Sequence, residues 1–214
     1  MVSKVDICNL ALQNIGAKSI TTLTDGTVEA TECNLRYDTV RRSILELHPW
    51  NFAIKRAALN KLSTSPAFGA DNQFGLPSDL VRMFATEEQT DFINFGSNFN
   101  GYLTISNQTS FSRADEYKLE IAPTGEKVLL SDDAAKNIIY VFDQEDVAKF
   151  APMFVELLAK ALGAAIAYKV TNSRTMASAE KQEFTDMLRS SKTVDAQQGT
   201  FERTEQSTYL GVRQ

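Results

Sequence analysis

The only histidine and the only tryptophan of this 214-residue chain stand two positions apart, as His48 and Trp50 with Pro49 between them. Histidine is the side chain whose ordinary pKa lies nearest to neutral pH, so His48 is the first candidate for proton transfer or metal binding. A catalytic histidine needs a nucleophile, and no serine or cysteine nucleophile motif lies near it. The alternative is a helix end, where a positively charged imidazole meets backbone carbonyls. We favour the helix end and predict no catalytic residue, no cofactor and no metal site.

Two other short motifs are also better explained by structure than by chemistry. Gly16–Ser19 (GAKS) is similar to part of a phosphate-binding loop, but the full pattern needs a preceding glycine and a strand-to-helix turn. It follows a helical pattern here, so we predict a helix C-cap. Cys8 and Cys33 have neither CxxC spacing nor histidine partners, which argues against a zinc site or a disulfide framework. Both are expected to be small core residues.

Pairs of adjacent carboxylates are the remaining candidates for acid–base chemistry. They are Glu87 with Glu88, Asp132 with Asp133, and Glu145 with Asp146. A glycoside hydrolase needs two carboxylates that face each other across the substrate. Adjacent residues on a strand point to opposite faces instead, so we expect these pairs to be solvated surface.

The charge and composition of the chain argue against nucleic acid and membrane as binding partners. Formal net charge is −5, the sequence pI is about 5.0 and hydrophobic residues make up 43% of the chain, which is typical of a globular protein. The sequence contains no cluster of Lys and Arg residues, so electrostatic binding to the nucleic-acid backbone is disfavoured. Polar residues interrupt the N-terminal apolar pattern and the apolar stretch 151–170, so we expect neither a signal peptide nor a membrane span.

Hydrophobic spacing predicts helices at both ends of the chain. The helices are expected over 3–15, 28–47, 152–170 and 173–196. In the second helix, the apolar seam is Ala30, Cys33, Tyr37, Val40, Ile44 and Leu47. Pro49 should end that helix, and the alternation of Trp50, Phe52 and Ile54 predicts a strand directly after it. His48, Pro49, Trp50 and Phe52 therefore form a predicted helix-to-strand hinge.

The middle of the chain has the pattern of short strands. We predict strands over 80–86, 92–95, 102–106, 117–122, 127–130 and 137–142, with a turn at 123–125 and a loop over 62–75. The predicted fold class is therefore α+β. An antiparallel bundle of two N-terminal and two long C-terminal helices (1–49 and 150–198) carries an inserted, small antiparallel β domain (50–149). An extended C-terminal tail (199–214) follows, with too little apolar surface to fold alone.

Four segments in this order give the chain a resemblance to a known family. They are DICNLALQNIGAKSI, EATECNLRYDTVRRSILELHPWNFA, FGLPSDLVRMF and FAPMFVELLAKALGAAIAYKVTNSR. Together they resemble the tail tubular protein A family of tailed bacteriophages, which are head-to-tail adaptor (connector) proteins. The most specific piece is HPWNFA at the end of a helix.

The resemblance implies a structural role in the virion, assembled in the host cytoplasm. Family members form a ring, usually of twelve copies, that joins the portal to the tail nozzle or tube while genomic DNA passes through the lumen. The family's C-terminal tail reaches toward the portal, which gives residues 199–214 a portal-binding role. The candidate contacts are Phe201, Tyr209, Leu210 and Val212 as apolar anchors and Arg203 and Arg213 as ion-pair donors. A ring of twelve chains at −5 each would carry about −60, and an acidic lumen would repel DNA phosphates.

Two alternatives stay open at the level of the sequence. One is a virion-associated peptidoglycan hydrolase, for which Glu145 and Asp146 would be the residues to examine. The other is a DNA-packaging or head-completion factor, which the absence of a basic stretch disfavours.

Overall fold

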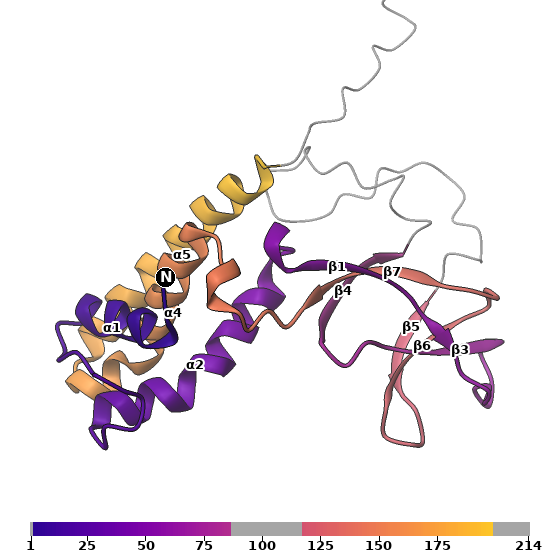
Figure 1. Cartoon of the computed structure of the whole chain (residues 1–214), viewed down its shortest axis with the longest axis horizontal. Helices are drawn as coiled ribbons and strands as arrows, with labels where there is room; N and C mark the ends of the chain where they lie inside the picture. The colour runs from indigo at the N-terminus through magenta and orange to yellow at the C-terminus, as the bar shows by residue number, and fades with distance from the viewer. Residues whose placement is uncertain (1, 87–116, 199–214) are drawn as a thin grey trace, which may run out of the picture.

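The computed structural model describes residues 2–86 and 117–198. It is a mixed helix and sheet structure, so the predicted α+β class is confirmed. The helices are α1 (Lys4–Asn14), α2 (Val28–Leu47), α4 (Pro152–Thr171) and α5 (Arg174–Ala196), with single 3-10 turns η1 (Asn51–Ala53) and η3 (Val147–Lys149). All strands lie between α2 and α4 in the chain. In Figure 1 the helices occupy the left side of the molecule and the strands the right.

The β part consists of two antiparallel sheets. The strands are β1 (Ile54–Ala58), β2 (Asn60–Lys61), β3 (Asn72–Gly75), β4 (Leu80–Thr86), β5 (Lys118–Ile121), β6 (Lys127–Ser131) and β7 (Asn137–Phe142). One sheet has the order β1-β7-β4 and the other β2-β3-β6-β5. A cluster of buried side chains from both sheets, including Phe74, Met83 and Leu129, packs the two together.

Local signals in the sequence explain where the helices begin and end. Ser3 and Asp6 form a capping box at the start of α1, and Gly16 follows its end with a φ of 68°. Thr27 accepts a hydrogen bond from the Ala30 amide at the start of α2. Pro152 is the first residue of α4, where its missing N–H is not needed. The positive φ of Gly16 directly after α1 confirms the helix C-cap predicted for GAKS.

α4 is the helix that the other three contact, whereas α1 and α2 barely touch each other. Ten of its residues are buried, among them Phe154, Leu158 and Leu162. Its small residues allow close approach, since a Cβ on Gly163 would lie 3.3 Å from the Ala11 carbonyl oxygen and 3.3 Å from Oε2 of Glu180. None of the helices in the described ranges is long and apolar enough to cross a membrane.

Three sequence predictions about the elements are wrong. The strand expected from Trp50 is the turn η1, because the Trp50 amide donates to the His48 carbonyl and the Ala53 amide donates to the Trp50 carbonyl. The loop expected over 62–75 contains strand β3, whose partner β6 lies more than fifty residues away. Leu47 is 46% exposed, while Arg41 is only 2% exposed and occupies the inner face of α2 in its place.

The remaining element predictions divide into confirmed and untested ones. The four helices agree with their predicted ranges to within one or two residues, and β4 and β7 match theirs. The turn at 123–125 joins β5 to β6, with Gly125 at a φ of 87°. The strands predicted over 92–95 and 102–106 lie outside the described residues, as does the tail 199–214.

Candidate functional site at the helix–sheet junction

The predicted hinge is the place where the chain passes from the helices to the sheets. α2 ends at Leu47, and His48 follows with an extended backbone (φ −154°, ψ 144°) because Pro49 excludes helical angles before it. Trp50 is 1% exposed, and its indole Nε1 donates a 3.0 Å hydrogen bond to the carbonyl of Ile44, one of the carbonyls that the helix end leaves without a backbone partner. The hinge residues therefore cap the C-terminal end of α2.

Aromatic rings of the hinge pack against the start of α4. The Trp50 ring meets the Phe154 ring edge to face at 5.3 Å, and the Phe52 ring meets Phe154 at 4.8 Å. Phe150 lies 5.7 Å from Phe52 and 5.0 Å from Phe154. The cluster joins the point where the chain leaves the helices to the point where it returns.

The carboxylate of Asp195, at the end of α5, also contacts the hinge. Nε2 of His48 and Oδ2 of Asp195 are 3.0 Å apart, and the Asn51 amide N–H donates to the same carboxylate at 3.3 Å. The Asn51 side chain also donates to the Asp195 backbone carbonyl at 2.7 Å. Asp195 is buried and lies three residues before the last described residue of the chain. The last turn of α5 is thereby fixed to the hinge.

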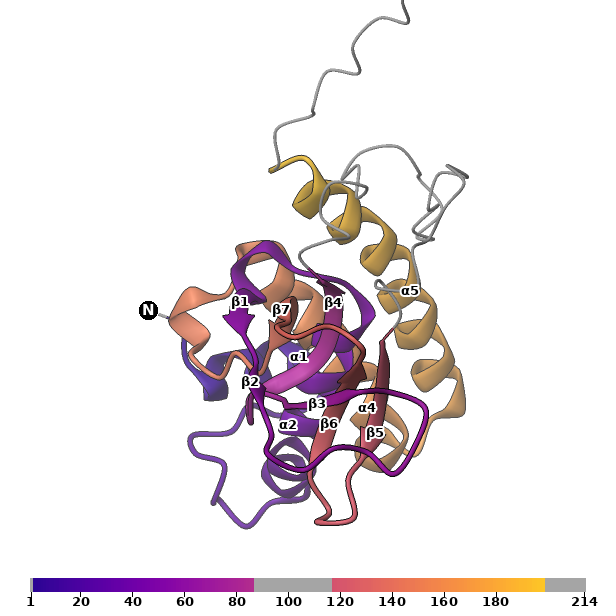
Figure 2. The same cartoon turned by 90° about the vertical axis from the view of Figure 1, so that its right-hand side faces the viewer.

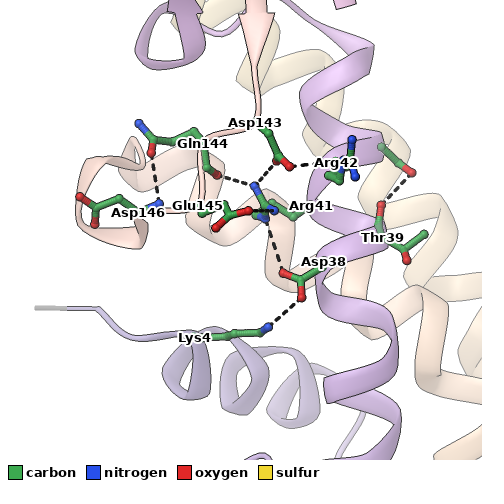
Figure 3. A network of polar contacts seen from close by, with 10 residues as sticks. Lys4, Asp38, Thr39, Arg41, Arg42, Asp143, Gln144, Glu145 and Asp146 are labelled. Carbon is green, nitrogen blue, oxygen red and sulfur yellow. Dashed lines mark hydrogen bonds and ion pairs between the residues drawn. The ribbon is translucent and has the colours of Figure 1, made fainter. Parts of the chain in front are cut away.

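A second polar contact, shown in Figure 3, ties the returning chain to α2. Nη1 of the buried Arg41 donates to Oδ1 of Asp143 at 2.5 Å and to the Gln144 carbonyl at 2.6 Å. Arg42 adds a 3.4 Å ion pair to Asp143 from the helix surface, and Asp38 lies 3.8 Å from Arg41. A buried guanidinium requires this degree of compensation, because an unpaired buried charge is strongly destabilising. Asp143 immediately follows β7, so its position is fixed where the β part ends.

A third carboxylate links strands within the β part. Asp79 accepts hydrogen bonds from Nζ of Lys55 at 2.7 Å and from the hydroxyl of Tyr140 at 3.1 Å. Partial burial opposes ionisation, but these two hydrogen bonds outweigh it and lower the pKa of Asp79. Burial and the bond to Asp79 raise the pKa of Tyr140 to about 12. Asp79 is therefore an ionised bridge, which is a structural use of a carboxylate.

The carboxylate pairs considered for catalysis have local structural contacts. The Asp146 carboxylate caps η3 by accepting from the Ala148 amide at 3.1 Å, and Oε1 of Glu145 lies 3.9 Å from Nη2 of Arg41. Asp132 accepts from the Asp71 amide, and Asp133 is held by Lys136. Glu87 and Glu88 lie outside the described residues. Among the described residues, each of these carboxylates therefore has a local structural partner.

A shallow surface hollow lies beside the junction. It has a volume of about 490 Å³ and is lined by Ser78, Asp79, Asp143, Gln144, Glu145 and Asp146. Asp79 and Asp143 are occupied by the cations described above, so the lining is less acidic than its residue types suggest. Within 2–86 and 117–198, no three His, Cys, Asp or Glu side chains are grouped to hold a metal ion.

The structure thus brings together all four predicted hinge residues. Sequence reasoning missed Arg41, Asp143 and Asp195, whose partners lie more than one hundred residues away in the chain. The predicted tail residues Phe201, Arg203, Tyr209, Leu210, Val212 and Arg213 lie outside the described residues. Comparison of the chain with protein-family models and with curated proteins finds no match.

Proposed function

We propose that this chain is a structural virion protein, a head-to-tail adaptor that joins the portal at the capsid vertex to the tail nozzle or tube. The observation that carries the proposal is the order of elements: two helices, a β part, two helices and a C-terminal segment, with HPWNFA at the first boundary. The family that the sequence resembles has this order. The role requires a rigid body and no catalytic group, which agrees with the structural use of His48 and of the carboxylates around it.

In this proposal the four helices act as one antiparallel bundle and the β part as an inserted domain. Copies of the chain pack side by side into a ring, twelve in number, and genomic DNA passes through the lumen without sequence-specific contacts. The Arg41 contact and the aromatic cluster support this arrangement, because they fix both chain connections between helices and sheets. A ring under the pressure of a filled head needs such a rigid connection.

The fixed end of α5 bears on the proposed portal contact. Residues 199–214 follow directly after the helix turn that Asp195 holds to His48 and Asn51. The tail therefore starts from a defined point on the body. A short segment bound from a defined origin has a higher effective concentration at its target than one on a long flexible linker.

Electron microscopy of the purified chain mixed with the portal protein of the same phage tests the proposal. We expect rings seated coaxially on the portal, with twelve copies around a continuous channel. Portal particles that stay bare at saturating concentrations of the chain would contradict an adaptor role.

The peptidoglycan hydrolase is the second candidate, and the hollow that contains Glu145 and Asp146 is the observation in its favour. A lysis assay on purified peptidoglycan separates the two functions. We expect no lysis from the wild-type chain. Lysis that disappears in a Glu145→Gln, Asp146→Asn double variant of unchanged stability would favour the enzyme over the adaptor.

A further inference from the structure

Three of the four basic residues of α5 lie on one face, and the fourth, Arg189, points about 60° away and pairs with Asp186. Arg174, Lys181 and Lys192 are seven and eleven residues apart, and at about 100° per residue their side chains point within about 20° of one another. Leu188 borders the stripe, seven residues after Lys181 and four before Lys192, and is half-buried against the chain's own hydrophobic core. The stripe is about 27 Å long at 1.5 Å per residue. In the sequence these residues are too far apart to be noticed as a cluster.

The basic stripe (Arg174, Lys181 and Lys192) lacks opposite charges to neutralise it. None of its three cations forms an ion pair with a residue in the described ranges, and Arg174 only stacks over the Tyr168 ring. Burial and the positive charge of Arg82 lower the pKa of Lys192, so the end of the stripe is uncompensated within the described fold. α5 packs on α4 and runs along the right-hand edge of the molecule in Figure 2.

α2 has an outer face with the opposite character. Leu35 is 67% exposed and Val28 is 54% exposed, seven residues apart on the side that faces away from Cys33 and Tyr37. Glu32 and Glu46 lie on the same face, and neither forms an ion pair with a described residue. Arg42 also lies on this side, but it is paired with Asp143. This outer face of α2 (Val28, Glu32, Leu35 and Glu46) therefore combines exposed apolar side chains with unpaired carboxylates.

We propose that the basic stripe of α5 docks against the outer face of α2 of a second copy of this chain. The proposal rests on the ring of the proposed function, because a closed ring is built from two different faces that complement each other. The lysines would meet Glu32 and Glu46, and the exposed edge of the half-buried Leu188 would lie beside the exposed apolar side chains. Val28 to Glu46 and Arg174 to Lys192 are helical segments of equal length, so the two faces match in length.

DNA is the other polyanion that a basic stripe could bind, and the structure favours protein. The chain as a whole carries −5, which disfavours a phosphate backbone as the partner. The outer face of α2 also exposes apolar area that a DNA contact would leave unexplained.

Charge exchange across the two faces tests the proposal in the full-length chain. Lys181→Glu with Lys192→Glu should weaken self-association by at least about tenfold, because like charges then face each other. Adding Glu32→Lys with Glu46→Lys to the same chain should restore association. Lys169→Glu, on α4, is the control and should leave association unchanged. Sedimentation velocity, alone and with portal protein, measures the effect. Equal association of all variants would overturn the proposal.

Cross-linking locates the contact directly and separates this proposal from the adaptor role. A chain with Leu35→Cys and Leu188→Cys, treated with a short bismaleimide, should give a ladder of cross-linked oligomers. The parent chain, whose Cys8 and Cys33 are buried, should not. Portal-bound rings without the ladder would overturn the interface and leave the adaptor role intact. A ladder without portal binding would support the interface and count against the adaptor. Loss of duplex DNA binding in the Lys181→Glu, Lys192→Glu variant, with the ladder retained, would assign the stripe to DNA and also overturn the proposal.

Discussion

At the scale of single residues, the rare side chains of the hinge serve the architecture of the junction. Trp50 fills the space between the end of α2 and the start of α4 and satisfies a carbonyl of α2. His48 contacts both the Trp50 ring, at 4.7 Å, and the carboxylate of Asp195. Each therefore joins elements that are distant in the chain.

Trp50→Ala should lower the free energy of unfolding by about 3 to 5 kcal/mol, because it leaves a large cavity and frees the Ile44 carbonyl. Urea denaturation followed by circular dichroism gives the value. Phe68→Ala is the control, since Phe68 is 88% exposed and its loss should change stability by less than about 0.5 kcal/mol. A Trp50→Ala variant as stable as the wild type would show that the ring is not buried.

Arg41→Met should cost about 3 kcal/mol, because it keeps much of the side-chain volume but removes the main partner of Asp143 and of the Gln144 carbonyl. Arg42→Met is the matched control on the neighbouring, exposed position and should cost between about 0 and 1 kcal/mol. Thermal unfolding at low and high salt separates the two. Similar losses for both variants would mean that Asp143 pairs with either arginine equally well.

Only some of the junction could be predicted from the sequence. Pro49 is a local signal and correctly predicted the end of α2, whereas the strand expected from Trp50 begins only at Ile54. The predicted seam of α2 leaves Arg41 out, because hydrophobic spacing counts only apolar residues. Its burial depends on Asp143, which arrives after a hundred intervening residues and leaves no local trace.

At the scale of elements, the helices were predictable and part of the sheet was not. Each helix has its own period, cap or proline, all within a few residues. Strands β4 and β7 are rich in apolar and aromatic residues, so they too were found. β3 lies in a stretch of turn-forming residues, and it is a strand because β6 and β2 pair with it on either side.

Gly163→Ala should destabilise the protein by about 1 to 3 kcal/mol, although alanine is the better helix former. The added Cβ would press on the Ala11 backbone oxygen, which cannot move without displacing α1. Ala165→Gly, at an exposed position of the same helix, should cost about 1 kcal/mol from helix propensity alone. A gain in stability from Gly163→Ala in urea denaturation would show that α1 can shift.

Glu180 should make stability fall as pH rises. Burial raises the pKa of this 3% exposed side chain above its ordinary 4.5, while Lys160, 3.7 Å away, only partly opposes the shift. Between pH 4.5 and the raised pKa, the folded protein therefore holds a proton that the unfolded chain has lost. The stabilising effect is complete below pH 4.5 and is lost as pH rises through the folded pKa.

Glu180→Gln should flatten this decline in the free energy of unfolding, measured in urea at a series of pH values. Glu183→Gln is the control, because Glu183 is exposed and pairs with Lys160 at the surface. An unchanged pH profile in Glu180→Gln would assign the dependence to another group.

At the scale of the whole molecule, the described fold and the C-terminal segment are expected to have separate roles. Deleting 199–214 should leave the helical circular dichroism and the melting temperature unchanged, because the last described helix is held by Asp195 within the body. The same truncation should abolish attachment to portal-bearing heads in a co-sedimentation assay. Full attachment of the truncated chain would place the portal contact on the body instead.

The central position of α4 also matters while the protein is being made. α1 and α2 have little contact with each other, so the buried faces around Ile7, Leu12 and Ile44 are covered only when α4 arrives. About a hundred residues separate the end of α2 from the start of α4. At roughly 5 to 20 residues per second, the ribosome needs on the order of 5 to 20 seconds to supply them. During that interval the nascent chain presents two uncovered apolar helices, which is the substrate that a ribosome-associated chaperone binds.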